Sequence, residues 1–310
     1  MKYCLICKTE VADKKGSHIV PHFLIKRIDN ESGKKERDKE LGFIINPDHT
    51  TSYFGRAVLP EKLKEIYGEV DDDLIEKNNI DGIVDNYFCT GCEKKLAAIE
   101  SAYSVSIKNL PTDENEYVSL ASPFVGFLFW VSIFWRLSIQ EGSGFKLKEK
   151  IEQRLGRIIA KYLEDDITKV QADQTDIDLV DIGYKVLRSP NYSDDNPTLM
   201  HWQPNYERPY SIMIDEYIIF LYIKKSHLNG MTLDFYGSEK FKKQATFNTP
   251  FNEEKTFPIK AEDFKTIFNR AIDMASKTRF KTLNFYLDEI HRRLGGDGKQ
   301  MNNSLKNEII

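Results

Sequence analysis

The residues with the clearest capacity for chemistry are four cysteines arranged as two pairs. Each pair has the spacing Cys-x-x-Cys, and the pairs are Cys4 with Cys7 and Cys89 with Cys92. Two thiolates on one tight turn can bind the same ion, and two such turns complete the tetrahedral site of structural zinc, with Zn–S bonds of about 2.3 Å. The spacing therefore predicts one structural Zn²⁺ ion bound by all four cysteines.

The two pairs lie far apart in the chain, because residues 8–88 separate them. A metal that joins them closes a long loop and so restricts the unfolded chain strongly. Such a cross-link would explain how an N-terminal segment with few long periodic elements folds. Two other interpretations stay open, namely a pair of redox Cys-x-x-Cys motifs or buried thiols that share no ligand.

A helix that follows the second pair would position it. Residues 93–108 have Leu96, Ile99 and Tyr103 on one helical face. A first Cys-x-x-Cys turn, an intervening segment and a second pair at the start of a helix is the order of a treble-clef zinc finger. We therefore predict that fold for the N-terminal part of the chain.

A histidine motif lies between the two pairs. Residues 17–21 read Ser-His-Ile-Val-Pro, and the β-branched residues after His18 predict a short strand that ends at Pro21. A histidine on a strand beside a metal-bound core can transfer protons or bind a metal. A structural histidine is the alternative for this position.

The two cysteine pairs with the His18 strand between them resemble the HNH endonuclease family, which has the ββα-metal fold. The resemblance covers residues 1–105, a third of the chain. It implies that His18 is the general base that activates water. It also implies a catalytic Mg²⁺ or Mn²⁺ ion that stabilises the scissile phosphate and the leaving oxygen.

The resemblance also points to the residues that would hold the catalytic ion. The family usually has Asp, Glu or His before the base, and a His or Asn shortly after the last cysteine. In this chain Ser17 precedes the base and Glu93 directly follows Cys92. Glu93 is therefore the expected carboxylate ligand, while Ser17 is a poor ligand for a hard cation. A treble clef without catalytic activity is the alternative.

The distribution of charge along the chain indicates what kind of partner it can bind. The chain has 44 basic and 48 acidic residues, a formal charge of −4 and a pI near 6.0, so no global positive field favours nucleic acid. Residues 2–39 differ, with ten basic and six acidic side chains. We expect Lys14 and Lys15, before the histidine strand, and Lys26 and Arg27, after it, to contact phosphates of a nucleic acid. DNA is the expected partner, and RNA is the open alternative. A solvated face of mixed charge is the alternative.

The composition is that of a globular protein, with 41% apolar and 30% charged residues. Residues 118–135 carry no charge, and this segment is just long enough to form a transmembrane helix. Pro123, together with several serines and a glycine, favours a buried core helix, so no membrane span is expected. If residues 118–137 were exposed instead, they would bind a partner or a second copy of the chain, as in a homo-oligomer.

The remaining pattern predicts a second, larger domain. Apolar residues at helical spacing, or runs rich in Ile, Tyr and Phe between turn residues, mark its elements. Helices are predicted over residues 146–163, 261–276 and 282–294, strands over residues 211–223 and 231–236, and a linker over residues 111–116.

Together these observations predict an α+β protein with two domains. Residues 1–108 form a treble-clef zinc domain of HNH type, residues 109–296 form a mainly helical domain with a small antiparallel sheet, and residues 297–310 form a flexible tail. No apolar signal segment opens the chain, so we expect it in the reducing cytoplasm.

The predicted function is hydrolysis of nucleic-acid phosphodiester bonds by an HNH-like, metal-dependent endonuclease, with bacterial defence as its setting by analogy. The alternative is a catalytically inactive zinc-finger module that binds nucleic acid or another protein. No glycine-rich phosphate loop and no Gly-x-Ser-x-Gly motif is present, so nucleotide hydrolysis and serine-hydrolase chemistry have no support.

Overall fold

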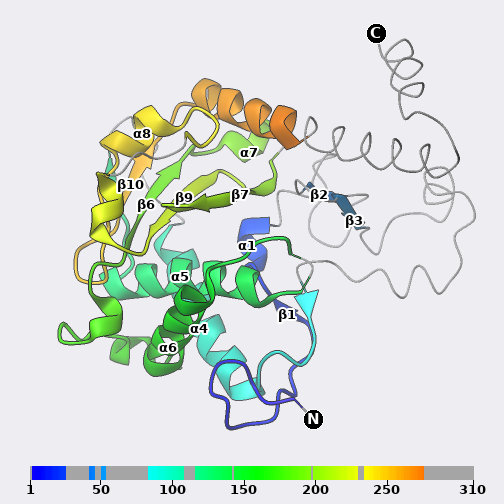
Figure 1. Cartoon of the computed structure of the whole chain (residues 1–310), viewed down its shortest axis with the longest axis vertical. Helices are drawn as coiled ribbons and strands as arrows, with labels where there is room; N and C mark the ends of the chain where they lie inside the picture. The colour runs from blue at the N-terminus through cyan, green and yellow to red at the C-terminus, as the bar shows by residue number, and fades with distance from the viewer. Residues whose placement is uncertain are drawn as a thin grey trace, which may run out of the picture.

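The computed structural model of the protein is shown in Figure 1. It describes residues 2–25, 42–45, 50–53, 83–107, 116–141, 143–196, 198–229 and 234–275, and at residues 42–45, 50–53, 195 and 203–206 it describes the backbone alone. The fold is a mixture of helices and strands, which agrees with the predicted α+β class.

A six-stranded sheet forms the centre of the fold. Its strand order is β5-β10-β6-β9-β8-β7, and every neighbouring pair is antiparallel except β10 and β6, which are parallel. The strands are β5 (Tyr117–Val118), β6 (Gly183–Arg188), β7 (Met200–Glu207), β8 (Tyr210–Ile214), β9 (Tyr217–Tyr222) and β10 (Lys255–Pro258).

Two short antiparallel pairs lie outside this sheet. One joins β1 (Ser17–His18) to β4 (Ile83–Val84), and the other joins β2 (Gly42–Ile45) to β3 (Thr50–Tyr53).

Helices cover both faces of the central sheet, so the fold has three layers (Figure 1). One layer contains α4 (Thr90–Ser106), α5 (Pro123–Ile139) and α6 (Glu149–Tyr162), and the other contains α7 (Tyr192–Asp195), α8 (Glu239–Gln244) and a helix over residues 261–275. A short helix α1 (His22–Ile25) follows β1, and the 3-10 helices are η2 (Ile167–Lys169), η3 (Ile177–Leu179) and η4 (Lys225–Leu228).

Strand β9 shows why this layering suits the sequence. Its side chains alternate between the two hydrophobic clusters that lie on opposite faces of the sheet. Tyr217, Ile219 and Leu221 join the cluster with α5, and the residues between them join the cluster with residues 261–275. A strand that is buried on both faces has an almost continuous apolar sequence, without polar alternation.

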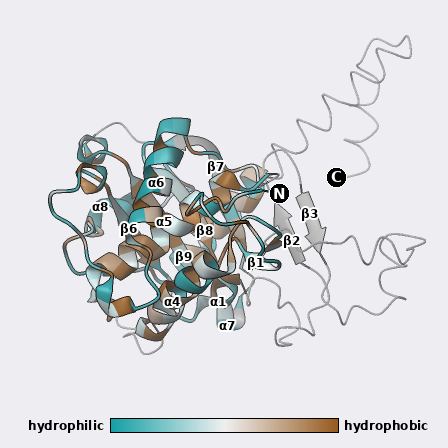
Figure 2. Ribbon diagram, turned by 90° about the horizontal axis from the view of Figure 1, so that it is seen from below, coloured by the Kyte–Doolittle hydropathy of each residue, from teal (hydrophilic) through white to brown (hydrophobic). Residues whose placement is uncertain are grey.

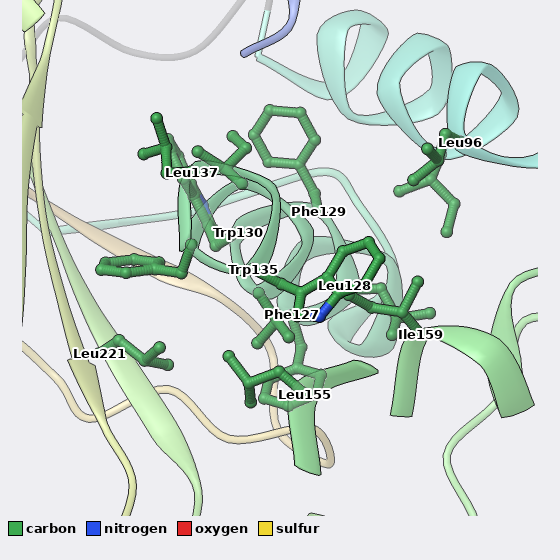
Figure 3. Packing of buried hydrophobic residues seen from close by; sticks show 14 of the residues in the cluster. Leu96, Phe127, Leu128, Phe129, Trp130, Trp135, Leu137, Leu155, Ile159 and Leu221 are labelled. Atoms are coloured by element: carbon green, nitrogen blue, oxygen red, sulfur yellow. The ribbon is translucent and has the colours of Figure 1, made fainter. Parts of the chain in front are cut away.

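Helix α5 is the core helix that the sequence predicts. Every residue from 124 to 138 is buried, and Pro123 occupies its first turn, where a missing backbone N–H costs nothing. Figure 3 shows Phe127, Trp130 and Leu137 of this helix packed among leucine and isoleucine side chains from α4, α6 and β9. The hydropathy colouring of Figure 2 likewise places hydrophobic residues in α5 and the central strands. Within the described residues, no helix has the length and hydrophobicity needed to span a membrane.

Several predicted elements need correction. The sheet is neither small nor purely antiparallel, since it has six strands and one parallel pair. The single apolar run at residues 211–223 forms the hairpin of β8 and β9, because the chain reverses at Asp215, whose φ is 54°. Of the strand predicted at residues 231–236, the described residues 234–236 form a turn instead, with a positive φ at Tyr236.

Other predicted elements agree with the structure or lie outside it. The helices predicted at residues 93–108, 146–163 and 261–276 correspond to α4, α6 and the helix over residues 261–275. The helix at residues 282–294, the tail at 297–310 and most of the linker at 111–116 lie outside the described residues.

The two predicted domains share one hydrophobic cluster. Cys4 and Leu96 from the N-terminal part belong to the same buried cluster as Trp130 of α5 and Leu221 of β9. Tight packing of this kind ties the N-terminal segment to the helical layer. The boundary at residue 108 lies outside the described residues and stays a prediction.

Candidate metal centre and histidine site

The four cysteines come together in the structure. Their sulfur atoms all lie within 4.8 Å of one another, and the Sγ atoms of Cys7 and Cys89 are 3.9 Å apart. A tetrahedral ion with metal–sulfur bonds of about 2.3 Å requires about 3.8 Å between sulfurs. All four thiols are free, and the 3.9 Å separation is far longer than a disulfide bond. The cluster can therefore hold one metal ion.

Each pair sits on a backbone turn that directs both thiols to one point. The first turn closes with a hydrogen bond from the Lys8 N–H to the Cys4 carbonyl (2.9 Å), and Lys8 has a φ of 60°. In the second pair, Cys89 is the N-cap of α4, and its sulfur accepts a hydrogen bond from the Cys92 N–H (3.4 Å). An N-cap side chain that accepts from the first turn of a helix satisfies a free backbone donor.

Main-chain and side-chain hydrogen bonds then join the two segments. The Leu5 N–H donates to the Tyr87 carbonyl (2.9 Å), and the Lys14 N–H donates to the Phe88 carbonyl (3.0 Å). Asp13 accepts a hydrogen bond from the Thr90 N–H (2.8 Å) at the first residue of α4. These hydrogen bonds hold together the two segments that carry the cysteine pairs, although the pairs lie more than 80 residues apart in the sequence.

The thiols differ in how easily they ionise. Burial raises the pKa of Cys89 and Cys92 above the usual range for a thiol. Burial also acts to raise the pKa of Cys7, but hydrogen bonds from Thr9 and the Glu10 backbone outweigh it and lower the pKa to about 6. A cation is therefore needed to hold Cys89 and Cys92 as thiolates, and its binding releases their protons.

His18 lies on β1, where it pairs with Ile83 of β4. The residue is half-buried, and its ring lies 5.7 Å from the ring of His22 in a T-shaped arrangement. Burial, followed by the nearby His22, lowers the pKa of His18 below its usual range, while Glu100 acts in the opposite direction. The imidazole is therefore neutral at pH 7 and able to accept a proton.

A buried arginine faces this strand. The Arg136 Nη1 atom donates to the His18 carbonyl oxygen (2.9 Å) and to Glu100 Oε1 (2.7 Å). Glu100 lies two turns after Glu93 on α4. A single arginine in an otherwise uncharged helix signals a buried acidic partner, but the sequence does not identify that partner.

Ser17, the first residue of β1, lies close to Glu93 in the first turn of α4. Burial raises the pKa of Glu93, and Ser17 and Arg136 act against that rise. The Ser17 Oγ and Glu93 Oε2 atoms are both buried, and the Ser17 hydroxyl lies close enough to the carboxylate to stabilise its charged form through a hydrogen bond.

The other predicted residues are placed only in part. Lys14 is half-buried, and its charge lowers the pKa of Glu93, so it lies near that carboxylate. Lys15 is exposed. Lys26 and Arg27 lie outside the described residues. Across those parts of the chain that the structure describes, the four cysteines are the only group of three or more potential metal ligands.

Comparisons with protein-family models, with curated proteins and with solved structures find no match to this chain. The HNH resemblance therefore depends on the motif residues themselves.

Proposed function

We propose that this protein is an HNH-like endonuclease in which a treble-clef domain, held by one structural Zn²⁺ ion, presents His18 to a nucleic-acid phosphodiester. The observation that carries the proposal is the position of His18. Its strand pairs with β4, and β4 leads into the cysteine-capped start of α4. Two paired strands followed by a helix are the arrangement that the ββα-metal resemblance implies.

The chemistry assigned to His18 follows from its environment. A general base at neutral pH must be neutral and must reach water. The half-buried imidazole, with its lowered pKa, meets both conditions. In the proposed reaction a ring nitrogen of His18 takes the proton of the attacking water, and Lys14 and Lys15 hold the flanking phosphates.

Glu93 is the residue proposed to hold a divalent ion. Mg²⁺ usually binds through one or two carboxylates, with waters and substrate phosphates as the other ligands. Glu93, a single carboxylate that lies near Ser17 and Lys14, suits that small protein contribution. The ion would supply positive charge to the scissile phosphate.

A second candidate function is binding without cleavage. It is favoured by the finding that, apart from the cysteines, the described residues bring no three potential ligands together. In that case the zinc domain would hold nucleic acid through its lysines, and His18 would be structural. The binding would weaken steeply with added salt.

Cleavage of supercoiled plasmid DNA with Mg²⁺ or Mn²⁺ distinguishes these functions. The comparison uses the wild type, His18→Ala and the matched control His227→Ala. His227 is also half-buried, and burial also lowers its pKa, but it lies on η4. Zinc content is measured for all three proteins.

The endonuclease predicts that the wild type and His227→Ala nick the plasmid, and that His18→Ala does so at least about 10²-fold more slowly. Equal cutting by His18→Ala would reject His18 as the base. Absence of cutting by the zinc-loaded wild type, together with salt-dependent DNA binding that survives in His18→Ala, would establish the second function.

A further inference from the structure

Arg136 is an unusual residue for its position. It is 1% exposed and is the only charged residue of α5, a helix otherwise buried among aromatic and aliphatic side chains. Taking a guanidinium out of water is costly unless its donors are satisfied. Replacement of such a group by an apolar residue is often tolerated, so stability alone does not explain why a charge is placed here.

The donors of Arg136 reach three different elements. The Nε atom donates to the Ser132 carbonyl (3.3 Å) and Nη2 donates to Ser132 Oγ (3.2 Å), so the side chain is held against its own helix. Nη1 is then directed outward to both Glu100 on α4 and the main-chain carbonyl of His18 on β1. A planar guanidinium can make these bonds at once because its donors form a rigid fork.

The strand that carries His18 is short, and the next residues, Ile19 and Val20, are buried in the hydrophobic cluster that contains α5. β1 contains two residues and pairs with β4 alone. Two-stranded ribbons are only marginally stable by themselves. The bond from Arg136 ends on the main chain of His18 itself, 118 residues away in sequence. A shift of that carbonyl would carry the Cα atom and the imidazole with it.

We propose that Arg136 is a positioning residue that fixes the His18 strand to the helical layer. It sets the direction in which the imidazole projects, and it makes that direction depend on the packing of α5 against the central sheet. Its consequence for catalysis depends on the proposed nuclease function, whereas its effect on the strand does not.

The test compares Arg136→Lys with the matched control Arg154→Lys. Arg154 is a half-buried arginine of α6 whose guanidinium donates to the carbonyls of Asp178, Val180 and Ile223. Both substitutions keep the charge and remove the fork. Two properties are measured in each zinc-loaded protein, namely amide hydrogen exchange of residues 17–20 and the steady-state kinetics of plasmid nicking.

In Arg136→Lys we expect exchange at residues 17–20 to be at least about 10-fold faster, because the local opening of the strand becomes easier. We also expect kcat to fall by about 10²-fold with KM changed less than about threefold, since a small displacement of a catalytic group affects the chemical step. Arg154→Lys should change neither property. If Arg136→Lys does not fold, Ser132→Ala should change both properties in the same direction but less, since it removes the Nη2 bond together with the bond from the Ser132 hydroxyl to the Phe129 carbonyl (2.8 Å) and leaves the bond to His18 in place.

Unchanged exchange at residues 17–20 in a folded Arg136→Lys or Ser132→Ala protein would overturn the proposal. Faster exchange with unchanged kcat would also overturn it, because the strand would then move without effect on the base. If the wild type does not cut DNA, faster exchange in Arg136→Lys alone still supports the positioning role, and only the proposed function fails.

Discussion

Removal of the metal from the cysteine cluster should lower the free energy of unfolding, by an amount that follows from the length of the loop that the metal closes. The ion would link Cys7 to Cys89, which are 82 residues apart. A cross-link that closes a loop of this length reduces the entropy of the unfolded chain by the equivalent of about 4.5 kcal/mol at 25 °C. A typical domain has a free energy of unfolding of about 5–15 kcal/mol. The metal-free protein should therefore lose about a third or more of its stability.

The measurement is urea unfolding of the zinc-loaded and the chelator-treated protein, followed by tryptophan fluorescence. Trp135 suits this purpose because its ring lies 6.2 Å from Phe88, the residue before Cys89, and both rings are buried. The urea midpoint should fall on chelation and recover when Zn²⁺ is added back. The Cys7→Ser variant should show a low midpoint with and without zinc, and its zinc content should fall below one ion per chain.

The matched control is Asp13→Ala. Asp13 joins the same two segments through the Thr90 N–H, but it is not a metal ligand. Its loss should cost about 1 kcal/mol and leave the zinc content unchanged. The reasoning would be refuted if zinc-loaded and chelated proteins unfolded within about 1 kcal/mol of each other, since the cysteines would then form no structural metal site.

Two further predictions concern the buried carboxyl of Glu254, which accepts hydrogen bonds from Tyr103 (2.8 Å) and Tyr184 (2.6 Å). Burial raises the pKa of Glu254 in the folded state. Between the ordinary pKa of the unfolded state and this raised pKa, the folded state binds more protons than the unfolded state. The free energy of unfolding should therefore fall by about 1.4 kcal/mol for each pH unit of increase through that interval. Glu254→Gln should remove this contribution in urea unfolding between pH 4 and pH 8, and parallel profiles for the two proteins would contradict it. Gly126→Ala should cost about 1–3 kcal/mol in thermal unfolding, because the added Cβ atom would lie 2.7 Å from Glu254 Oε2. Gly91→Ala, whose Cβ atom meets nothing closer than 4.0 Å, is the matched control and should cost nothing.

The sequence alone identified the features that depend on local pattern. Two Cys-x-x-Cys turns predict a four-sulfur cluster because each turn fixes the separation of its own two thiols, and the structure brings all four within 4.8 Å. Helix α5 was predictable because Pro123 and the small polar residues of a long uncharged segment favour a buried helix over a membrane span. The helices α4 and α6 follow from apolar residues at helical spacing.

Features that depend on strand pairing were less predictable. The run at residues 211–223 is apolar throughout because both faces of β9 are buried, and that removes the alternation that would have marked separate strands. The hairpin turn at Asp215 has neither a glycine nor a proline to mark it. Strands β5 and β10 contain two and four residues and are defined mainly by the partners they meet.

Only the tertiary structure determined what surrounds the candidate site. The sequence indicated that a buried Arg136 needs an acidic partner, and packing determined that the partner is Glu100 and that the arginine also binds the His18 carbonyl. Packing likewise determined that Ser17 lies close to Glu93. The physical reason is that these contacts join residues 36 and 118 positions apart, and local periodicity carries no information on which distant side chains share a layer.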